Sequence, residues 1–286
     1  MKYYQVNFRL TPYNEDFADV LTALAADLGF ESFMPTDEGV IAYIQQRLYV
    51  EDTIGQLCSA FPLPGVTVEY TTEEAEDKNW NAEWEASGFE PIVIDSRLCV
   101  HDTLHNAPTD TDINLCINPR QAFGSGTHPT TRTLLNTLLD LPLKGKKIVD
   151  AGCGTGVLGI LCAMLGAKHV MAYDIDNWSV ENTLDNLTLN HLGGMHTEGC
   201  FEVREGDCSV LRGIGEVDLL IANIFREIIL ADLPAFIQTL QPHAQLLLSG
   251  FYDQDAPAII EAAAHYGFRL VRQTMCEEWA VLLLER

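Results

Sequence analysis

The sequence has few basic residues and no long apolar run, and both absences narrow the class of protein. Only 17 lysine and arginine residues stand against 41 aspartate and glutamate residues, which gives a formal net charge of −24. A field of that sign repels phosphate backbones, so we expect no direct nucleic-acid binding and favour a basic protein partner. No apolar stretch reaches the roughly 18 residues that a membrane helix needs, so no membrane association is expected.

The N-terminus and the cysteines also lack familiar signals. The first ten residues, MKYYQVNFRL, alternate polar and apolar and contain no apolar signal core, which favours a cytoplasmic protein. None of the eight cysteines forms a C-x-x-C pair, and the loose groups of histidine and cysteine at 101–105 and 191–208 have no recognised zinc spacing. We therefore predict reduced cysteines and no metal.

Residues 1–75 have the pattern of a small α+β domain. Two stretches carry apolar residues at helical spacing, and four have the alternation or the short apolar runs of strands. In chain order these are strand 4–10, helix 17–28, strands 32–34 and 40–44, helix 54–61 and strand 66–70. The order βαββαβ predicts a ferredoxin-like fold. With three basic and twelve acidic residues, the domain suits the docking of a basic protein substrate.

Residues 76–95 are predicted to link this domain to the rest of the chain. The stretch TTEEAEDKNWNAEWEASGFE, residues 71–90, is charged and lacks strand alternation. It carries Trp80 and Trp84, whose spacing of four places both on one face of a helical turn. We interpret the two tryptophans as packing residues between domains.

Residues 96–286 are predicted to form a single α/β catalytic domain. Strands are expected at 147–150, 170–174, 201–204, 217–222 and 245–249, with helices near 130, 157–165, 179–190, 227–240 and 257–266. Such alternation predicts a mostly parallel sheet with helices on both faces. Two further strand candidates, 92–94 and 115–117, precede it. Only Thr274–Glu278 separates the last two strand candidates, 269–273 and 279–284, so the final strand should run antiparallel.

The turn after the first of the parallel strands carries two overlapping glycine patterns. In IVDAGCGTGVLG, Gly154, Gly156 and Gly159 fit the dinucleotide pattern G-x-G-x-x-G, while Asp150 and Gly152 begin the pattern D-x-G-x-G-x-G. Glycine lets the backbone approach a ligand closely, and the helix that follows offers its positive N-terminal end. Both patterns indicate a nucleotide site, but they indicate different nucleotides.

The polar residues at the strand ends favour S-adenosylmethionine over NAD. Asp174 ends the next strand, 20 residues after Gly154, where a carboxylate can bind the ribose hydroxyls of either ligand. Asp150 would repel a pyrophosphate but suits a ligand with a sulfonium and an ammonium group. Asp207, after the third strand, is placed to accept from the adenine amine, and Asn223 ends the fourth strand at the ligand-binding edge. Each of these last two residues could instead cap a helix.

Seven stretches carry a more specific signal. They lie in order between residues 79 and 283 and read NWNAEWEASGFEPIVIDSRLCV, AFGSGTHPTTRTLLNTL, IVDAGCGTGVLGI, AYDID, LLIANI, LLLSGF and EEWAVL. The chain thereby resembles the bacterial methyltransferases of ribosomal protein L11, the stalk-base protein of the large subunit. The run AFGSGTHPTT is the most specific part of the match. The resemblance implies a class I S-adenosylmethionine-dependent methyltransferase, with a Rossmann-like seven-stranded sheet, behind an N-terminal substrate-recognition domain.

The resemblance also implies site residues and a substrate. In that family the cofactor is held by the second threonine of H-x-T-T, the first glycine of the motif, the first acid of D-x-D and the asparagine of A-N-I. These are Thr131, Gly152, Asp174 and Asn223. The implied enzyme is a protein-lysine N-methyltransferase that acts on a basic large-subunit protein, with the N-terminal amine as a further candidate acceptor. We expect it to be a monomer.

The chain departs from the family pattern at a few places. Arg120 replaces the usual glycine, Ser125 the usual threonine and Phe225 the usual leucine, and the insertion-like run HLGGMHTEGC lengthens the loop after the expected helix 179–190. These departures concern the active-site loop and the fit of the substrate rather than the cofactor.

Methyl transfer needs an amine that arrives neutral, with its lone pair aimed at the methyl carbon. The sequence shows no obvious general base. Asn223 and its neighbouring backbone are the candidates for orienting the amine. His128 follows a candidate lid that contains Gly124 and Gly126, and it is predicted to contact substrate, to shuttle a proton or to cap the next helix.

Two alternatives stay open at this point. A methyltransferase of a nucleobase, a glutamine amide or another protein or small-molecule amine would use the same turn, although the usual N-P-P-[FY] of nucleobase and amide enzymes is replaced by NIFR at 223–226. A non-catalytic module that senses the cofactor is the other alternative. Every expected ligand position is filled, which favours the enzyme.

Overall fold

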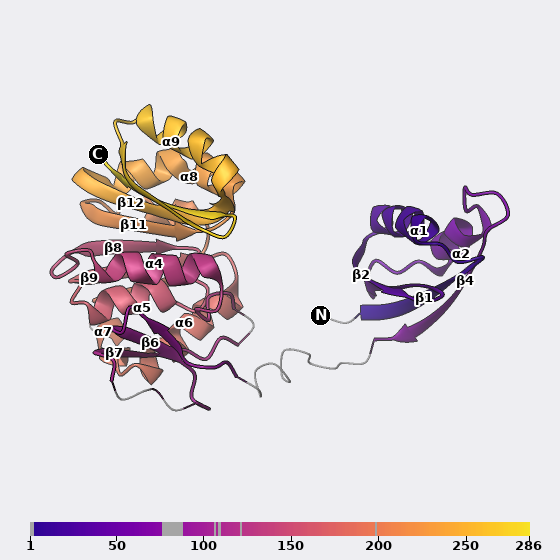
Figure 1. The fold of residues 1–286 in the computed structure, drawn as a ribbon, viewed down its shortest axis with the longest axis horizontal. Helices are drawn as coiled ribbons and strands as arrows, with labels where there is room; N and C mark the ends of the chain where they lie inside the picture. The colour runs from indigo at the N-terminus through magenta and orange to yellow at the C-terminus, as the bar shows by residue number, and fades with distance from the viewer. Residues whose placement is uncertain (1–2, 76–87, 106, 108–109, 121, 198) are drawn as a thin grey trace. The chain divides into compact units, whose positions relative to one another are not determined.

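The computed structural model describes residues 3–75, 88–105, 107, 110–120, 122–197 and 199–286. The chain divides into two compact units, Met1–Trp80 and Asn81–Arg286. Each unit is drawn in Figure 1. The predicted helical turn with Trp80 and Trp84 lies outside the described residues.

The N-terminal unit has the predicted βαββαβ order. Its elements are β1 (Tyr3–Thr11), α1 (Glu15–Asp27), β2 (Phe30–Thr36), β3 (Gly39–Gln45), α2 (Glu51–Ser59) and β4 (Thr67–Glu74). The four strands form a sheet in the order β2-β3-β1-β4, and all neighbours are antiparallel. Alternate residues of β1, Val6, Phe8 and Leu10, are buried against helix residues such as Leu21 and Ile54. The ferredoxin-like assignment of this arrangement remains our interpretation.

Two expectations about the stretch between the units need correction. Strand β4 continues to Glu74, inside the stretch 71–90 that was expected to lack strands, because it is an edge strand whose polar residues bond across to β1. Glu73, for example, accepts from Gln5 and Asn7. At the other end, β5 (Ile92–Ile94) pairs with β6 (Leu98–His101) and so belongs to the C-terminal unit.

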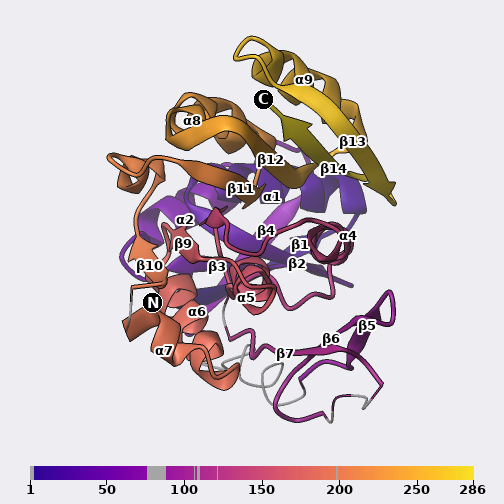
Figure 2. The same cartoon turned by 90° about the vertical axis from the view of Figure 1, so that its left-hand side faces the viewer.

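A seven-stranded sheet forms the centre of the C-terminal unit. Its strands are β8 (Lys147–Ala151), β9 (His169–Asp174), β10 (Phe201–Glu205), β11 (Val217–Asn223), β12 (Leu240–Tyr252), β13 (Arg269–Cys276) and β14 (Trp279–Glu285). They lie in the order β10-β9-β8-β11-β12-β14-β13, and Figure 2 shows β10 and β13 at opposite ends. The first five are parallel and β14 runs antiparallel to both neighbours, so the predicted direction of the final strand is confirmed.

Helices cover both faces of this sheet, as the alternation predicts. The helices are α4 (Pro129–Leu139), α5 (Val157–Met164), α6 (Asn177–Leu189), α7 (Gly193–Thr197), α8 (Arg226–Thr239) and α9 (Ala256–Ala264). One core joins α4, α5 and α6 to sheet residues such as Ile148 and Ile221, and the other joins α8 and α9 to their neighbours Val149 and Leu220. The side chains of consecutive strand residues thus pack into cores on opposite faces of the sheet.

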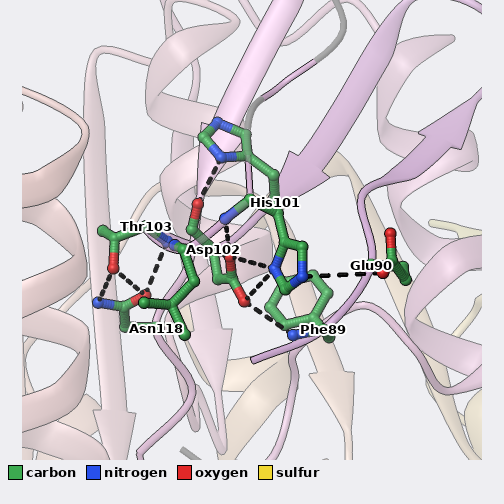
Figure 3. Close-up of polar contacts among 8 residues, drawn as sticks. Phe89, Glu90, His101, Asp102, Thr103 and Asn118 are labelled. Carbon is green, nitrogen blue, oxygen red and sulfur yellow. Dashed lines mark hydrogen bonds and ion pairs between the residues drawn. The ribbon is translucent and has the colours of Figure 1, made fainter. Parts of the chain in front are cut away.

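A small sheet of β5, β6 and β7 (Ile113–Cys116) precedes the large one. Directly after β6 comes a buried carboxylate, Asp102, which accepts backbone N–H groups of Phe89, Leu104 and His105 at 2.7, 2.9 and 2.8 Å (Figure 3). His105 Nδ1 also lies 2.9 Å from this carboxylate. Burial opposes ionisation of Asp102, but the hydrogen bonds from Phe89 and His105 outweigh it and hold its pKa below the usual range.

Candidate active site

A cavity of about 650 Å³ opens where β8, β9 and β11 end. The strand order reverses between β8 and β11, which is where open α/β sheets bind ligands. The volume is in the range of nucleotide and cofactor sites. The predicted site residues that line it are His128, Gly152, Gly154, Asp174, Asp207 and Asn223.

The glycine turn presents bare backbone to this cavity. Gly152 and Gly154 have φ values of +70° and +54°, in the left-handed region that favours glycine. A Cβ on Gly152 would lie 2.4 Å from Ile224 Cγ2, and one on Gly154 would lie 2.2 Å from the carbonyl oxygen of Phe123. These two positions therefore need glycine for both conformation and space.

Asp174 ends β9 and is held in place by the turn. Its Oδ2 accepts the N–H of Gly154 at 3.0 Å, and its Oδ1 accepts the N–H of Asp176 at 3.0 Å. Each carboxylate oxygen retains a further lone pair for a ligand hydroxyl. The placement fits the predicted ribose contact.

Asp150 lies elsewhere than its predicted role requires. It is only 1% exposed, does not line the cavity, and accepts the N–H of Gly159 at 2.9 Å inside α5. Burial raises the pKa of Asp150 to about 7, and the charge of Asp174 adds to the rise while the Gly159 N–H opposes it. The direct ligand contact that the motif suggested is thus replaced by an internal contact that joins β8 to α5.

The two threonines of H-P-T-T occupy different places. Thr131 is 1% exposed and does not line the cavity, and its Oγ1 has no hydrogen-bond partner among the described residues. Thr130, which the sequence did not single out, lines the cavity and bonds to His128 and Asn223. Adjacent helix positions point in directions about 100° apart, so a motif spacing alone does not decide which threonine faces a ligand.

Asp207 has the capping role considered for it and lies in the cavity, where its predicted contact with the adenine amine stays a prediction. It lines the cavity, and its Oδ1 also accepts the N–H of Ser209 at 2.9 Å as the N-cap of a short 3-10 helix, Cys208–Leu211. The side chain and the backbone N–H of Ser209 lower the pKa of Asp207.

His128 caps helix α4, which is one of the three roles predicted for it. Its Nδ1 accepts the backbone N–H of Thr130 at 3.3 Å. The imidazole also forms edge contacts with Phe123 and Trp279, with ring centroids 5.5 and 5.0 Å apart. The glycine loop before it is tied to the motif, because Thr155 Oγ1 donates to the carbonyl of Gly124 at 2.8 Å.

Of three residues that depart from the family pattern, Phe225 lines the cavity, and Arg120 and Ser125 do not. Arg120 pairs with Asp185 of α6 at 2.7 Å, away from the cavity lining. Ser125 is buried and bonds to Thr127 at 2.8 Å. Phe225 lines the cavity and is 70% exposed, which places it at the mouth. Gly193–Thr197 of the inserted run form the short helix α7.

The cavity also contains residues that the sequence reasoning missed. Besides Thr130, they include Ile175, Gly250 and Trp279. Gly250 and Trp279 lie within the stretches LLLSGF and EEWAVL, so the resemblance could have identified them. Ile175 could have been found because it directly follows the acid that ends β9.

The comparisons with known proteins agree with this geometry. The family model for ribosomal protein L11 methyltransferase (PrmA) matches residues 21–286. The chain is 45% identical to the ribosomal protein L11 methyltransferase of Phocaeicola vulgatus and 42% identical to that of Bacteroides thetaiotaomicron, with at least 98% of each chain covered. The chain belongs to this family.

A solved structure of a ribosomal protein L11 methylase, from Lactobacillus delbrueckii subsp. bulgaricus, shares the fold. It is 26% identical with a TM-score of 0.62, and the match covers 69% of this chain and 99% of that one. The family, the class I methyltransferase fold and the use of S-adenosylmethionine, all predicted from the sequence, are confirmed.

The described residues fit the family's cofactor. The buried Thr131 Oγ1 lacks a partner within the described ranges, Gly152 lines the cavity without a side chain, and Asp174 keeps acceptor capacity. Nowhere in the described ranges do three histidine, cysteine or acidic side chains gather as a metal site would require. No helix in the described part of the chain is long and apolar enough to cross a membrane.

Proposed function

We propose that this L11 methyltransferase homologue transfers methyl groups to amines of the ribosomal protein L11 of its own cell, in the cytoplasm. The acceptors are lysine side chains, with the N-terminal amine as a further candidate. The observation that carries the proposal is similarity along the whole chain, including the N-terminal unit, to relatives that bear this name. Seventeen basic against 41 acidic residues suit an encounter with a basic substrate.

The proposed cofactor contacts follow from the cavity lining. Asp174 would accept from the ribose hydroxyls, Asp207 from the adenine amine, and Gly152 would lie against the amino acid tail. Thr131 would supply its unpartnered hydroxyl to the same tail after a small local adjustment. Asp150 would act through α5, because its carboxylate already accepts from Gly159.

When bound, S-adenosylmethionine supplies a methyl group on a positively charged sulfur, which leaves as a neutral thioether. The residues of the chain have to exclude water and aim the lone pair of a neutral amine at that methyl carbon. Asn223 lines the cavity at the end of β11 and is the proposed acceptor for an amine N–H. The methylated ammonium returns its proton to water, so no protein base is required.

Residues 1–75 are proposed to be the docking domain for the substrate. They contain three basic and twelve acidic residues. A docked protein would present its amines to the catalytic unit at a high effective concentration, so that several could be modified in turn.

The decisive test is mass spectrometry of purified L11 after incubation with the enzyme and S-adenosylmethionine. We expect mass increases of 14 Da per methyl group (the mass of CH₂) on lysine-containing peptides. Calorimetry should show binding of S-adenosylmethionine and none of NAD. The proposed substrate would be overturned if purified L11 stayed unmodified while the enzyme methylated another protein or a small amine in a cell extract.

An acid in the cavity and an acid outside it provide matched variants. Asp174→Ala should weaken S-adenosylmethionine binding by about 1–3 kcal/mol, because a partly buried ribose loses its acceptor. Asp185→Ala, on the exposed side of α6 where Asp185 pairs with Arg120, should leave binding unchanged. Equal effects of the two changes would contradict the assigned role of Asp174.

A further inference from the structure

The hydroxyl of Thr130 lies between two side chains that line the cavity. Its Oγ1 is 2.8 Å from His128 Nδ1 and 3.3 Å from Asn223 Nδ2. Thr130 is 1% exposed, so water has little access to replace these contacts. One hydroxyl therefore joins the start of α4 to the end of β11.

The direction of each hydrogen bond can be worked out from the backbone. The N–H of Thr130 points at His128 Nδ1 at 3.3 Å, so Nδ1 is an unprotonated acceptor. The Thr130 hydroxyl has a single proton, which it must donate to the same nitrogen. It can then only accept from its other neighbour, so the amide nitrogen of Asn223, and not the amide oxygen, must face Thr130.

This direction fixes what Asn223 presents to a substrate. With Nδ2 turned to Thr130, Oδ1 is the group left for the cavity, and within the described ranges no donor is bonded to it. A neutral amine that donates an N–H to Oδ1 is restrained in its rotation, and its lone pair can be held toward the methyl carbon. The reversed amide would present two N–H donors, which repel an amine N–H.

We propose that Thr130 is a positioning residue for methyl transfer, which holds the Asn223 amide so that Oδ1 accepts from the substrate amine. The inference rests on the proposed methylation of an amine. It also assigns His128: with Nδ1 occupied as an acceptor, the neutral ring carries its proton on Nε2. His128 then orients Thr130 and does not act as the base.

Three threonine variants separate positioning from cofactor binding and from structure. Thr130→Val keeps the shape but removes the hydroxyl, and should lower kcat for L11 by about 10- to 100-fold with the Kd for S-adenosylmethionine within twofold of wild type. Thr130→Ser should restore most of kcat. Thr137→Val is the control, since Thr137 is also buried in α4 but donates to the carbonyl of Thr133, and its kcat should stay at the wild-type value. A kcat within twofold of wild type for Thr130→Val, or an equal loss for Thr137→Val, would overturn the proposal.

A spectroscopic measurement tests the hydrogen-bond direction without any turnover. Nitrogen-15 NMR at pH 8, with His128 assigned by comparison with His128→Gln, should show the Nε2–H tautomer in the wild type and a mixed population in Thr130→Val. A wild-type Nδ1–H tautomer would overturn the proposal. Failure of the wild type to methylate L11 would instead overturn the proposed function, while the tautomer would still decide the direction of these hydrogen bonds.

Discussion

A hollow of about 1020 Å³ opens on the N-terminal unit, and one of about 650 Å³ opens on the C-terminal unit. In the larger hollow, the charges of Arg9 and Glu38 are paired with each other in an exposed ion pair at 3.0 Å. The smaller hollow has left-handed glycines, a carboxylate at a strand end and, beside it, the buried Thr131 hydroxyl, which has no partner within the described ranges. Bare glycine backbone, a carboxylate at a strand end and an unsatisfied buried hydroxyl together indicate a reactive site better than volume does.

The largest expected effect comes from removing the first unit. Deleting residues 1–75 should leave S-adenosylmethionine binding intact, because the C-terminal unit has its own cores and contains the whole cavity. Methylation of L11 should fall by about 10²-fold or more, since the substrate loses its tethered docking site. On the same preparation, calorimetry measures S-adenosylmethionine binding and mass spectrometry measures methylation of L11. Methylation at the wild-type rate would show that the first unit does not dock the substrate.

A second difference between the units is the pH dependence of stability. The folded pKa of Asp150 is about 7, well above its unfolded value, so the folded state binds the proton more tightly. Its contribution is therefore largest at low pH and is lost as the pH rises to about 7. From pH 5 to pH 8 this loss amounts to about 2–3 kcal/mol.

Asp150→Asn should abolish that part of the pH dependence, since the amide does not titrate. Urea unfolding at pH 5 and pH 8, followed by tryptophan fluorescence, measures the change relative to wild type. The N-terminal unit has no buried carboxyl among its described residues, and burial raises the pKa of Cys58 to about 11, above this window. If the free energy of unfolding changed equally between pH 5 and pH 8 in wild type and variant, the titrating group would be a residue other than Asp150.

The glycine turn gives a third test, with a control in the same unit. Gly152 and Gly145 have similar φ values, +70° and +79°, so alanine costs about 1–2 kcal/mol of backbone strain at either. Only at Gly152 would the new Cβ meet a neighbour, Ile224 Cγ2 at 2.4 Å, inside the cavity. Gly152→Ala should raise the Kd for S-adenosylmethionine by about tenfold, and Gly145→Ala should leave it unchanged. Similar Kd values for the two variants would remove Gly152 from the binding site.

The sequence predicts the large sheet better than the small elements around it. Alternating strands and helices of ordinary length produce a strong periodic signal, and the short Thr274–Glu278 link excludes a crossover, so β14 could be oriented in advance. Strand β6, Leu98–His101, and helix α7 were missed. Both are too short for a period, and β6 is stabilised by pairing with segments on either side.

For the site, the sequence predicts where a residue lies in the sheet better than it predicts which group its side chain contacts. Asp174 and Asn223 end parallel strands, and such ends meet at one edge of a sheet whatever the details. Asp150 also lies near the end of a parallel strand, β8, yet its carboxylate turns to Gly159. Likewise, the threonine that lines the cavity is Thr130 and not Thr131. These outcomes depend on side-chain direction and hydrogen-bond partners, which arise only when distant segments pack together.

The smallest expected effect comes from replacing a glycine in the larger hollow by alanine. This change should stabilise the protein, whereas alanine at Gly152 adds backbone strain. Gly55 lies inside α2, and a Cβ there would be 3.7 Å from Tyr70 Oη, an ordinary contact. Alanine should therefore stabilise the unit by about 0.5–1 kcal/mol, because it restricts the unfolded chain and favours helix. Hydrogen exchange of β1 amides should slow by about two- to fivefold, with S-adenosylmethionine binding unchanged. Faster exchange would contradict this account of α2, and a selective loss of L11 methylation would place substrate docking at this hollow.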